Sequence, residues 1–163
     1  PQPGGLEGLR APYAEGDVVA VGGGSDPWWD TARGDRPPHL APELDWVVGS
    51  SFIGQADRLS EVRNLMGCTM SFRHDALVAV GGFAEEAGRV GTIPIGCEET
   101  EACIQVRRQL PGARVMLNPG SRVRHRVTED RVTWRYLREL VENGGTMMAA
   151  YEEALAKAGL TRG

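Results

Sequence analysis

The sequence lacks several features that would assign it to a class of protein at once. Lysine occurs once, at position 157, and no apolar run approaches the length that crosses a bilayer. The three cysteines, Cys68, Cys97 and Cys103, have neither the spacing of a zinc knuckle nor that of a redox C-x-x-C motif. The formal net charge of -4 gives no general reason to expect nucleic acid as a partner. We therefore expect a reducing, cytoplasmic compartment, in which Cys68 and Cys103 are buried free thiols.

What is present indicates one folded unit. At 163 residues the chain is long enough for one domain with a sizeable core, and no compositional seam divides it. Helical patterns alternate with short strand patterns, which predicts an α/β fold with a short mixed β-sheet flanked by helices. A strand is expected at residues 17–21, ended by Gly22–Gly24. A long loop is expected at 25–42, where the adjacent Trp28 and Trp29 either stack on a sugar or, as we favour, anchor the loop.

The segment from Asn64 to Arg73 has the alternation of a β-strand. One face is bulky and apolar, while the other is mostly small and includes Gly67 and Thr69. Small residues allow another backbone or a ligand to come close. A short helix is expected next, capped by Asp75 and stopped by Gly81–Gly82.

A helix is predicted from Glu98 to Leu110. Its apolar stripe includes Cys103 and Val106, and Glu99 lies one turn before Cys103 on the same stripe. A single carboxylate is therefore directed toward the packed side. Burial there raises the pKa of such a group, whereas the helix N-terminus favours its charged form.

Arginine is concentrated in the second half of the chain, where nine arginines lie between Arg107 and Arg138. Two interpretations stand side by side: the arginines meet phosphates, or they form a solvated rim. Short strands are expected at 114–117 and 122–127, and alternation leaves His125 among apolar neighbours on the face opposite the arginines. C-terminal helices are expected at 130–160, the first beginning at Thr128 or Asp130.

Several of these segments, in their order along the chain, resemble family 2 glycosyltransferases with the GT-A fold. A strand that ends in Phe72-Arg73 leads to a Gly81-Gly82-Phe83 turn, and an acidic pair, Glu98-Glu99, then opens a helix. Later, a strand carrying His125 precedes the segment Arg131-Val-Thr-Trp134. The resemblance covers about Leu6 to Tyr136. Each motif alone is weak, and the ordered set is the specific signal.

The resemblance implies a chemical role for two of these residues. Glu99 would be the general base that deprotonates the acceptor hydroxyl, because inversion at the anomeric carbon needs an in-line, activated oxygen. His125 would help to hold a divalent metal, Mn or Mg, that neutralises the departing diphosphate. The alternatives are structural: the acidic residues complement a helix N-terminus, and a histidine between two valines belongs to the core.

The resemblance also implies binding roles. Gly67 and Cys68 would lie beside the donor sugar, and Arg131 would contact the diphosphate. Close strand packing explains Gly67 equally well. Acceptor contacts are implied for Asp45, Trp46 and Glu98. The partners would be a nucleotide sugar and a glycan or another hydroxyl acceptor.

One departure from the family pattern shapes the expectation for the whole chain. The sequence contains no Asp-x-Asp metal motif and no glycine-rich phosphate loop after a strand. We therefore expect residues 1–163 to be a single domain, the C-terminal, acceptor-side portion of the fold without its nucleotide-binding half, and inactive alone. An open sheet edge would favour a homodimer or pairing with the missing half. The alternative is a non-enzymatic glycan- or partner-binding domain, and the complete enzyme could associate with a membrane.

Overall fold

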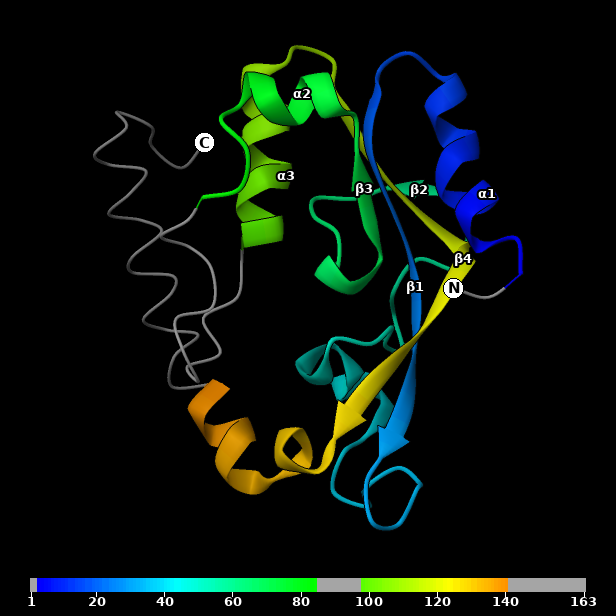
Figure 1. Ribbon diagram of the computed structural model, residues 1–163, viewed down its shortest axis with the longest axis vertical. Helices are drawn as coiled ribbons and strands as arrows, with labels where there is room; N and C mark the ends of the chain where they lie inside the picture. Colours follow the sequence, from blue (N-terminus) through cyan, green and yellow to red (C-terminus); the bar gives the residue numbers. More distant parts are fainter. Residues whose placement is uncertain (1–2, 85–97, 141–163) are drawn as a thin grey trace.

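Two long strands, β1 (Val18–Asp30) and β4 (Arg114–Thr128), run parallel along the molecule and organise everything else (Figure 1). The computed structural model describes residues 3–84 and 98–140. Short strands complete the sheet in the order β2-β4-β1-β3, with β2 antiparallel to β4 and β3 antiparallel to β1. The other elements are α1 (Gly5–Arg10), β2 (Ser60–Glu61), β3 (Met70–Phe72), α2 (His74–Ala79) and α3 (Glu98–Gln109). The expected mixed sheet with flanking helices is thus confirmed.

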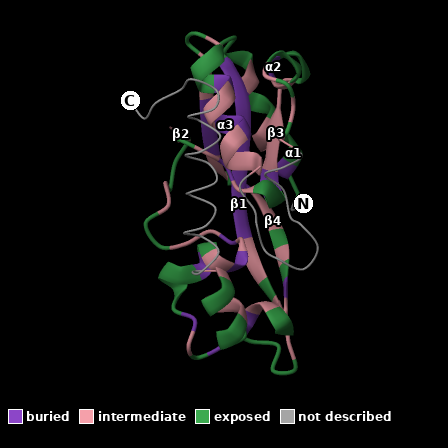
Figure 2. Ribbon diagram, turned by 90° about the vertical axis from the view of Figure 1, so that its left-hand side faces the viewer, coloured by how far each residue is buried: buried purple, intermediate pink, exposed green. Residues whose placement is uncertain are grey.

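Helices cover both faces of one half of the ribbon formed by β1 and β4. In Figure 1, α2 and α3 lie on one side and α1 on the other. The first side buries Ala20 and Val115 of the strands against Ala76 of α2 and Cys103 and Val106 of α3. Figure 2 shows the buried residues following β1 through this half. Valine and alanine suit these positions, because a strand that is buried on both faces needs apolar side chains throughout.

A second cluster lies at the other end of the ribbon. Leu40, Val48, Val127 and Val132 are buried there, and Trp29 and Leu137 pack against them. Val48 comes from the 3-10 helix η2 (Pro42–Val48), and Val132 from η5 (Glu129–Val132). Trp29 is therefore the anchor that the sequence favoured. Trp28 points to the other face and is 47 % exposed, and the Arg124 guanidinium lies 5.3 Å from its ring centroid.

The predicted stop at Gly22–Gly24 is wrong, because β1 continues through the three glycines to Asp30. The expected loop at 25–42 therefore starts only after Asp30. The glycines are required by close approach of neighbouring backbone. A β-carbon on Gly23 would lie 2.3 Å from the carbonyl oxygen of Ser121, and one on Gly22 would lie 2.7 Å from Leu65. The register between β1 and β4 also shifts between Gly23 and Gly24.

Other expected strands differ in extent. The two strands at 114–117 and 122–127 are one strand, β4, whose irregular register at Asn118–Arg122 accommodates Pro119 and Gly120. Of the segment 64–73, only Met70–Phe72 is a strand, and the 3-10 helix η3 (Gly67–Thr69) precedes it. Cys68 is exposed on η3, which contradicts its expected burial, whereas Cys103 is buried as expected. Cys97 lies outside the described residues.

Helix boundaries follow the sequence more closely. The helix predicted at 98–110 is confirmed as α3, and Gly81 and Gly82 end α2 with left-handed backbone, at φ 89° and 82°. The start of α2 lies at His74, one residue before the expected cap, Asp75. The last described helix spans residues 134–140, and Thr133 caps it by accepting a 3.1 Å hydrogen bond from the Tyr136 amide. Residues 141–160 of the expected C-terminal helices lie outside the described part.

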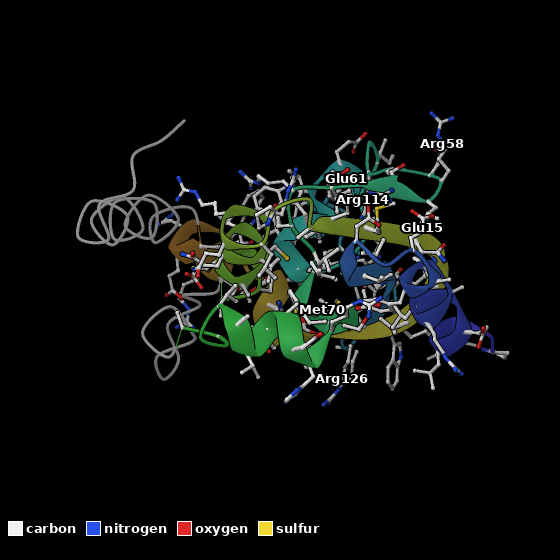
Figure 3. The ribbon with its side chains drawn as sticks, turned by 90° about the horizontal axis from the view of Figure 1, so that it is seen from above. Glu15, Arg58, Glu61, Met70, Arg114 and Arg126 are labelled. Atoms are coloured by element: carbon white, nitrogen blue, oxygen red, sulfur yellow. The ribbon has the colours of Figure 1, made fainter. Side chains whose placement is uncertain are left out.

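The exposed face of β4 carries arginines that pair with acidic residues of neighbouring elements. Arg122 and Arg126 form ion pairs with Asp26 and Asp30 of β1. Figure 3 shows Arg114 near Glu15 and Glu61, with which it also pairs. These contacts favour the solvated-rim interpretation for these arginines. Across the described residues, no helix has the length and apolar character to span a membrane.

The packing of Gly23 predicts a measurable loss of stability. Gly23→Ala should lower the free energy of unfolding by about 1–3 kcal/mol, because the new methyl group meets a carbonyl oxygen that belongs to a paired strand. Gly16→Ala is the matched control, since nothing lies within 4 Å of a β-carbon there. Urea unfolding of the two variants measures the difference. Equal stability of both variants would contradict this role for Gly23.

Candidate functional site

The start of α3 meets the turn η3 at Glu99 and Gly67. A β-carbon on Gly67 would lie 3.7 Å from Cδ of Glu99 and 3.8 Å from its Oε1, so the carboxylate lies directly over the glycine. The Gly67 backbone also lies close enough to the Glu99 carboxylate to favour its charged form. The sequence placed these two residues on separate elements, and the fold brings them together. A β-carbon at position 67 would make only ordinary contacts with the carboxylate, and the residue lies on a 3-10 turn outside the strand, so neither the carboxylate nor strand packing requires a glycine there.

The surroundings of Glu99 raise the pKa of its carboxyl above 4.5. Burial is the largest cause, and the neighbouring charge of Glu98 acts in the same direction. Backbone hydrogen bonds, including the one from Gly67, oppose the shift. A carboxylate with a raised pKa binds a proton more readily than an exposed glutamate, which suits a general base.

Cys68 lies between two opposite charges. Its Sγ donates a 3.4 Å hydrogen bond to the carbonyl oxygen of Gly49, which also accepts a 3.2 Å bond from the buried Ser25 hydroxyl. Partial burial of the sulfur raises the pKa of the Cys68 thiol, while the positive charge of Arg131 lowers it and the negative charge of Glu99 raises it. The two charged groups therefore both act on the position of Cys68. A charge that develops near Cys68 during a reaction would therefore interact with both groups.

His125 and Arg131 are in direct contact. Arg131 Nη1 lies 3.1 Å from His125 Nε2, and Arg131 Nε donates to the Tyr136 hydroxyl at 3.4 Å. The pKa of His125 is lowered, chiefly by burial and then by the charge of Arg131, while a backbone hydrogen bond to Val48 acts in the opposite direction. His125 is thus a neutral ring at neutral pH. It is half-buried, as its place among apolar neighbours on β4 predicts.

A pocket of about 140 Å³ opens beside Cys68. Its lining includes Gly67, Cys68 and Thr69 of η3 and Leu6 of α1. Ser121 and Arg122 of β4 close another side. The two residues that the resemblance implies for donor binding therefore line a hollow that a small polar ligand could enter.

The residues implied for the acceptor have different surroundings. Asp45 is 4 % exposed and forms a two-pronged ion pair with Arg36, at 2.5 and 2.7 Å, whereas Trp46 is 51 % exposed. Asp45 also lines a larger, open pocket of about 530 Å³ with Phe52 and Gln55. Glu98 stands beside Glu99 at the start of α3. If Asp45 contributes to acceptor binding, it therefore does so by holding Arg36 in place or by lining the larger pocket.

Sequence reasoning missed Gly49 and Tyr136. Gly49 has φ 80°, and a β-carbon there would lie 3.2 Å from His125 Nε2, so a side chain at this position would press on the ring. The signal available was local, a glycine after the apolar pair Val47-Val48, and it indicated only a turn. Tyr136 contacts Arg131 by ring and hydroxyl and lies one helical turn beyond it.

A metal ion is implied by the resemblance, and the residues present do not fit one. Within residues 3–84 and 98–140, no three His, Cys, Asp or Glu side chains come together as a metal site. The Nε2 atom of His125, which would bind the ion, faces a guanidinium instead. Octahedral ions of the Mg or Mn type need several oxygen ligands. Metal dependence therefore stays a prediction.

Comparison with known proteins adds a relative. The chain is 36 % identical over 121 residues to the glucosyl-dolichyl phosphate glucuronosyltransferase of Haloferax volcanii. The match covers 74 % of this chain, and the chain spans about 37 % of the length of that relative. No family model and no solved structure matches the chain. The chain is thus similar to part of a glycosyltransferase.

The raised pKa of Glu99 predicts how stability depends on pH. The folded protein prefers the protonated carboxyl, so this preference stabilises fully below pH 4.5 and is lost as the pH rises through the raised pKa. Glu99→Gln should therefore gain stability relative to the wild type between about pH 4 and about pH 8 in urea unfolding. Glu101→Gln is the matched control, because it removes a charge from the same helical turn without touching Gly67. An equal change with pH in both variants would contradict the burial of Glu99.

Proposed function

We propose that this chain forms the acceptor-side, base-bearing portion of an inverting glycosyltransferase of family 2 with the GT-A fold. The observation that carries the proposal is the Glu99 carboxylate over Gly67, the residue before Cys68, with the Arg131 cation acting on the same cysteine. The similarity to a glycosyltransferase over 74 % of the chain supports it. The mixed sheet, with helices on both faces, is compatible with a partial Rossmann-like fold.

The proposed reaction uses these groups in one displacement. Glu99 accepts the proton of the acceptor hydroxyl while the oxygen of that hydroxyl attacks the anomeric carbon of the donor sugar. The bond from the anomeric carbon to the diphosphate breaks, and its electron pair leaves with the diphosphate. Attack from the opposite side inverts the configuration. Arg131 stabilises the negative charge that develops on the diphosphate, and Gly67 and Cys68 line the space for the sugar.

The substrates follow from the same comparison. We propose a nucleotide sugar as donor and a sugar hydroxyl as acceptor. The relative is named for action on glucosyl-dolichyl phosphate, so a lipid-linked sugar is the first acceptor to test. Such an acceptor would bring the complete protein to a membrane surface. Asp45, Trp46 and Glu98 stay the proposed acceptor contacts, since Trp46 is exposed and Glu98 adjoins the base.

Removing the base gives the decisive test. In a protein that contains this chain and transfers sugar, Glu99→Gln should lower kcat by about 100-fold or more, because proton transfer by a placed carboxylate contributes that much. The wild-type rate should rise with pH through the raised pKa of Glu99, since only the deprotonated form accepts the proton. Glu101→Gln, whose side chain bonds Gln105, is the control and should stay within about threefold. A Glu99→Gln rate close to that of the control would contradict the proposal.

Measuring how donors bind to the isolated chain shows whether the chain is only a portion of an enzyme or builds a complete donor site by itself. Titration with UDP-, GDP- and TDP-sugars, with and without Mn²⁺, should show weak affinities that agree within about twofold, because the shared diphosphate is all that Arg131 recognises. Isothermal calorimetry measures this. A strong, Mn²⁺-dependent preference for one nucleotide would show that the chain itself builds the donor site. Failure of Glu99→Gln to reduce transfer would instead favour a non-enzymatic glycan- or partner-binding domain.

A further inference from the structure

The ring nitrogen of His125 that a metal would use is already occupied. A guanidinium can only donate hydrogen bonds, so the 3.1 Å contact from Arg131 Nη1 requires Nε2 of His125 to accept. The ring is then the neutral tautomer, with its proton on Nδ1. Burial of the ring favours the same neutral state.

The surroundings fix the ring in this orientation. Gly49 lies against it with left-handed backbone, and a β-carbon there would lie 3.2 Å from Nε2. The Val48 backbone also lies close enough to the ring to affect its pKa, in the direction that favours the charged form. Val48 itself is fully buried in the second core cluster, so this backbone has little freedom to move. The position of the Nε2 lone pair is therefore set by the fold.

Arg131 differs from Arg122 and Arg126 of β4 in what holds it. Arg122 and Arg126 are paired with carboxylates of β1. Arg131 is held by neutral groups: the His125 lone pair, the Tyr136 hydroxyl, and the Tyr136 ring at 5.8 Å. None of the ion pairs within the described residues includes Arg131. Within the described residues no carboxylate forms an ion pair with its guanidinium, although the adjacent Asp130 acts on its charge, and a guanidinium held by neutral groups can still bind an anion from solution.

We infer that His125 is a positioning residue, whose neutral ring holds Arg131 toward the diphosphate of the substrate, in place of binding a metal. The identity of the anion as a diphosphate rests on the proposed function. The positioning itself rests on the contacts among His125, Arg131, Tyr136 and Gly49. A metal at Nε2 would have to displace the guanidinium and would find no further cluster of ligands in the described part of the chain.

Binding of inorganic pyrophosphate tests the inference without requiring transfer activity. In EDTA, the full chain should bind pyrophosphate, and Arg131→Ala should weaken that binding about tenfold. His125→Ala should weaken it about threefold or more, whereas His125→Gln should stay within about twofold, because the amide oxygen can accept from Arg131. Arg135→Ala is the control, since Arg135 is an exposed arginine of the same segment with its own partner, Glu139. Circular dichroism verifies the fold of each variant.

The outcomes separate the two roles of His125. Loss of binding in His125→Gln equal to that in His125→Ala would overturn the inference, as would pyrophosphate binding only with Mn²⁺ or no binding by the wild type. Nitrogen-15 NMR of the ring should show the Nδ1-protonated tautomer, and Mn²⁺ should leave the signals of His125 sharp. Selective broadening by Mn²⁺ would establish metal ligation instead. Pyrophosphate binding is measured without sugar transfer, so failure of the proposed base would be seen separately, in the transfer assay of Glu99→Gln.

Discussion

The parallel pairing of β1 with β4 is the constraint on which the rest of the structure depends. The two strands pair on both sides of a register shift at Gly23 and Gly24, where a β-carbon on Gly23 would collide with the Ser121 carbonyl oxygen in the irregular segment of β4. Leu65, which precedes η3, and Thr69, its last residue, pack on Gly22 and Gly23. The glycines thus fix the height of η3 above the sheet. They thereby determine where Gly67 meets Glu99.

The two ends of the ribbon contribute opposite charges to one place. Glu99 comes from a helix packed on the first core cluster, through Cys103 and Val106. Arg131 follows the end of β4, next to the second cluster, which buries Val127 and Val132. Cys68 is influenced by both charges. A carboxylate and a cation held by separate cores are kept from neutralising each other, and the proposed reaction, which removes a proton on one side and develops negative charge on the other, needs that separation.

The periodicity of the sequence identified the features that depend on residues close together along the chain. The stripe through Cys103 and Val106 placed Glu99 on the packed side of α3, and alternation placed His125 opposite the arginines of β4. The glycines at 22–24 were misread as a stop because their cause is a carbonyl oxygen of Ser121, far away in the sequence. Gly49 escaped notice for the same reason, since its partner is His125. Contacts between distant segments leave no periodic trace, so neither could be predicted from the pattern.

The arginines show how far composition can lead. Their density between Arg107 and Arg138 suggested phosphate binding, yet Arg114, Arg122 and Arg126 have carboxylate partners and form a solvated face. The density of arginines along the sequence therefore does not identify an anion-binding site. The distinguishing property is the kind of group that fixes the guanidinium: a carboxylate cancels its charge, whereas a neutral imidazole or phenol restricts its motion and leaves the charge available. By that criterion Arg131 is the proposed anion receptor, and we propose that the histidine beside it acts through its lone pair and does not bind an ion.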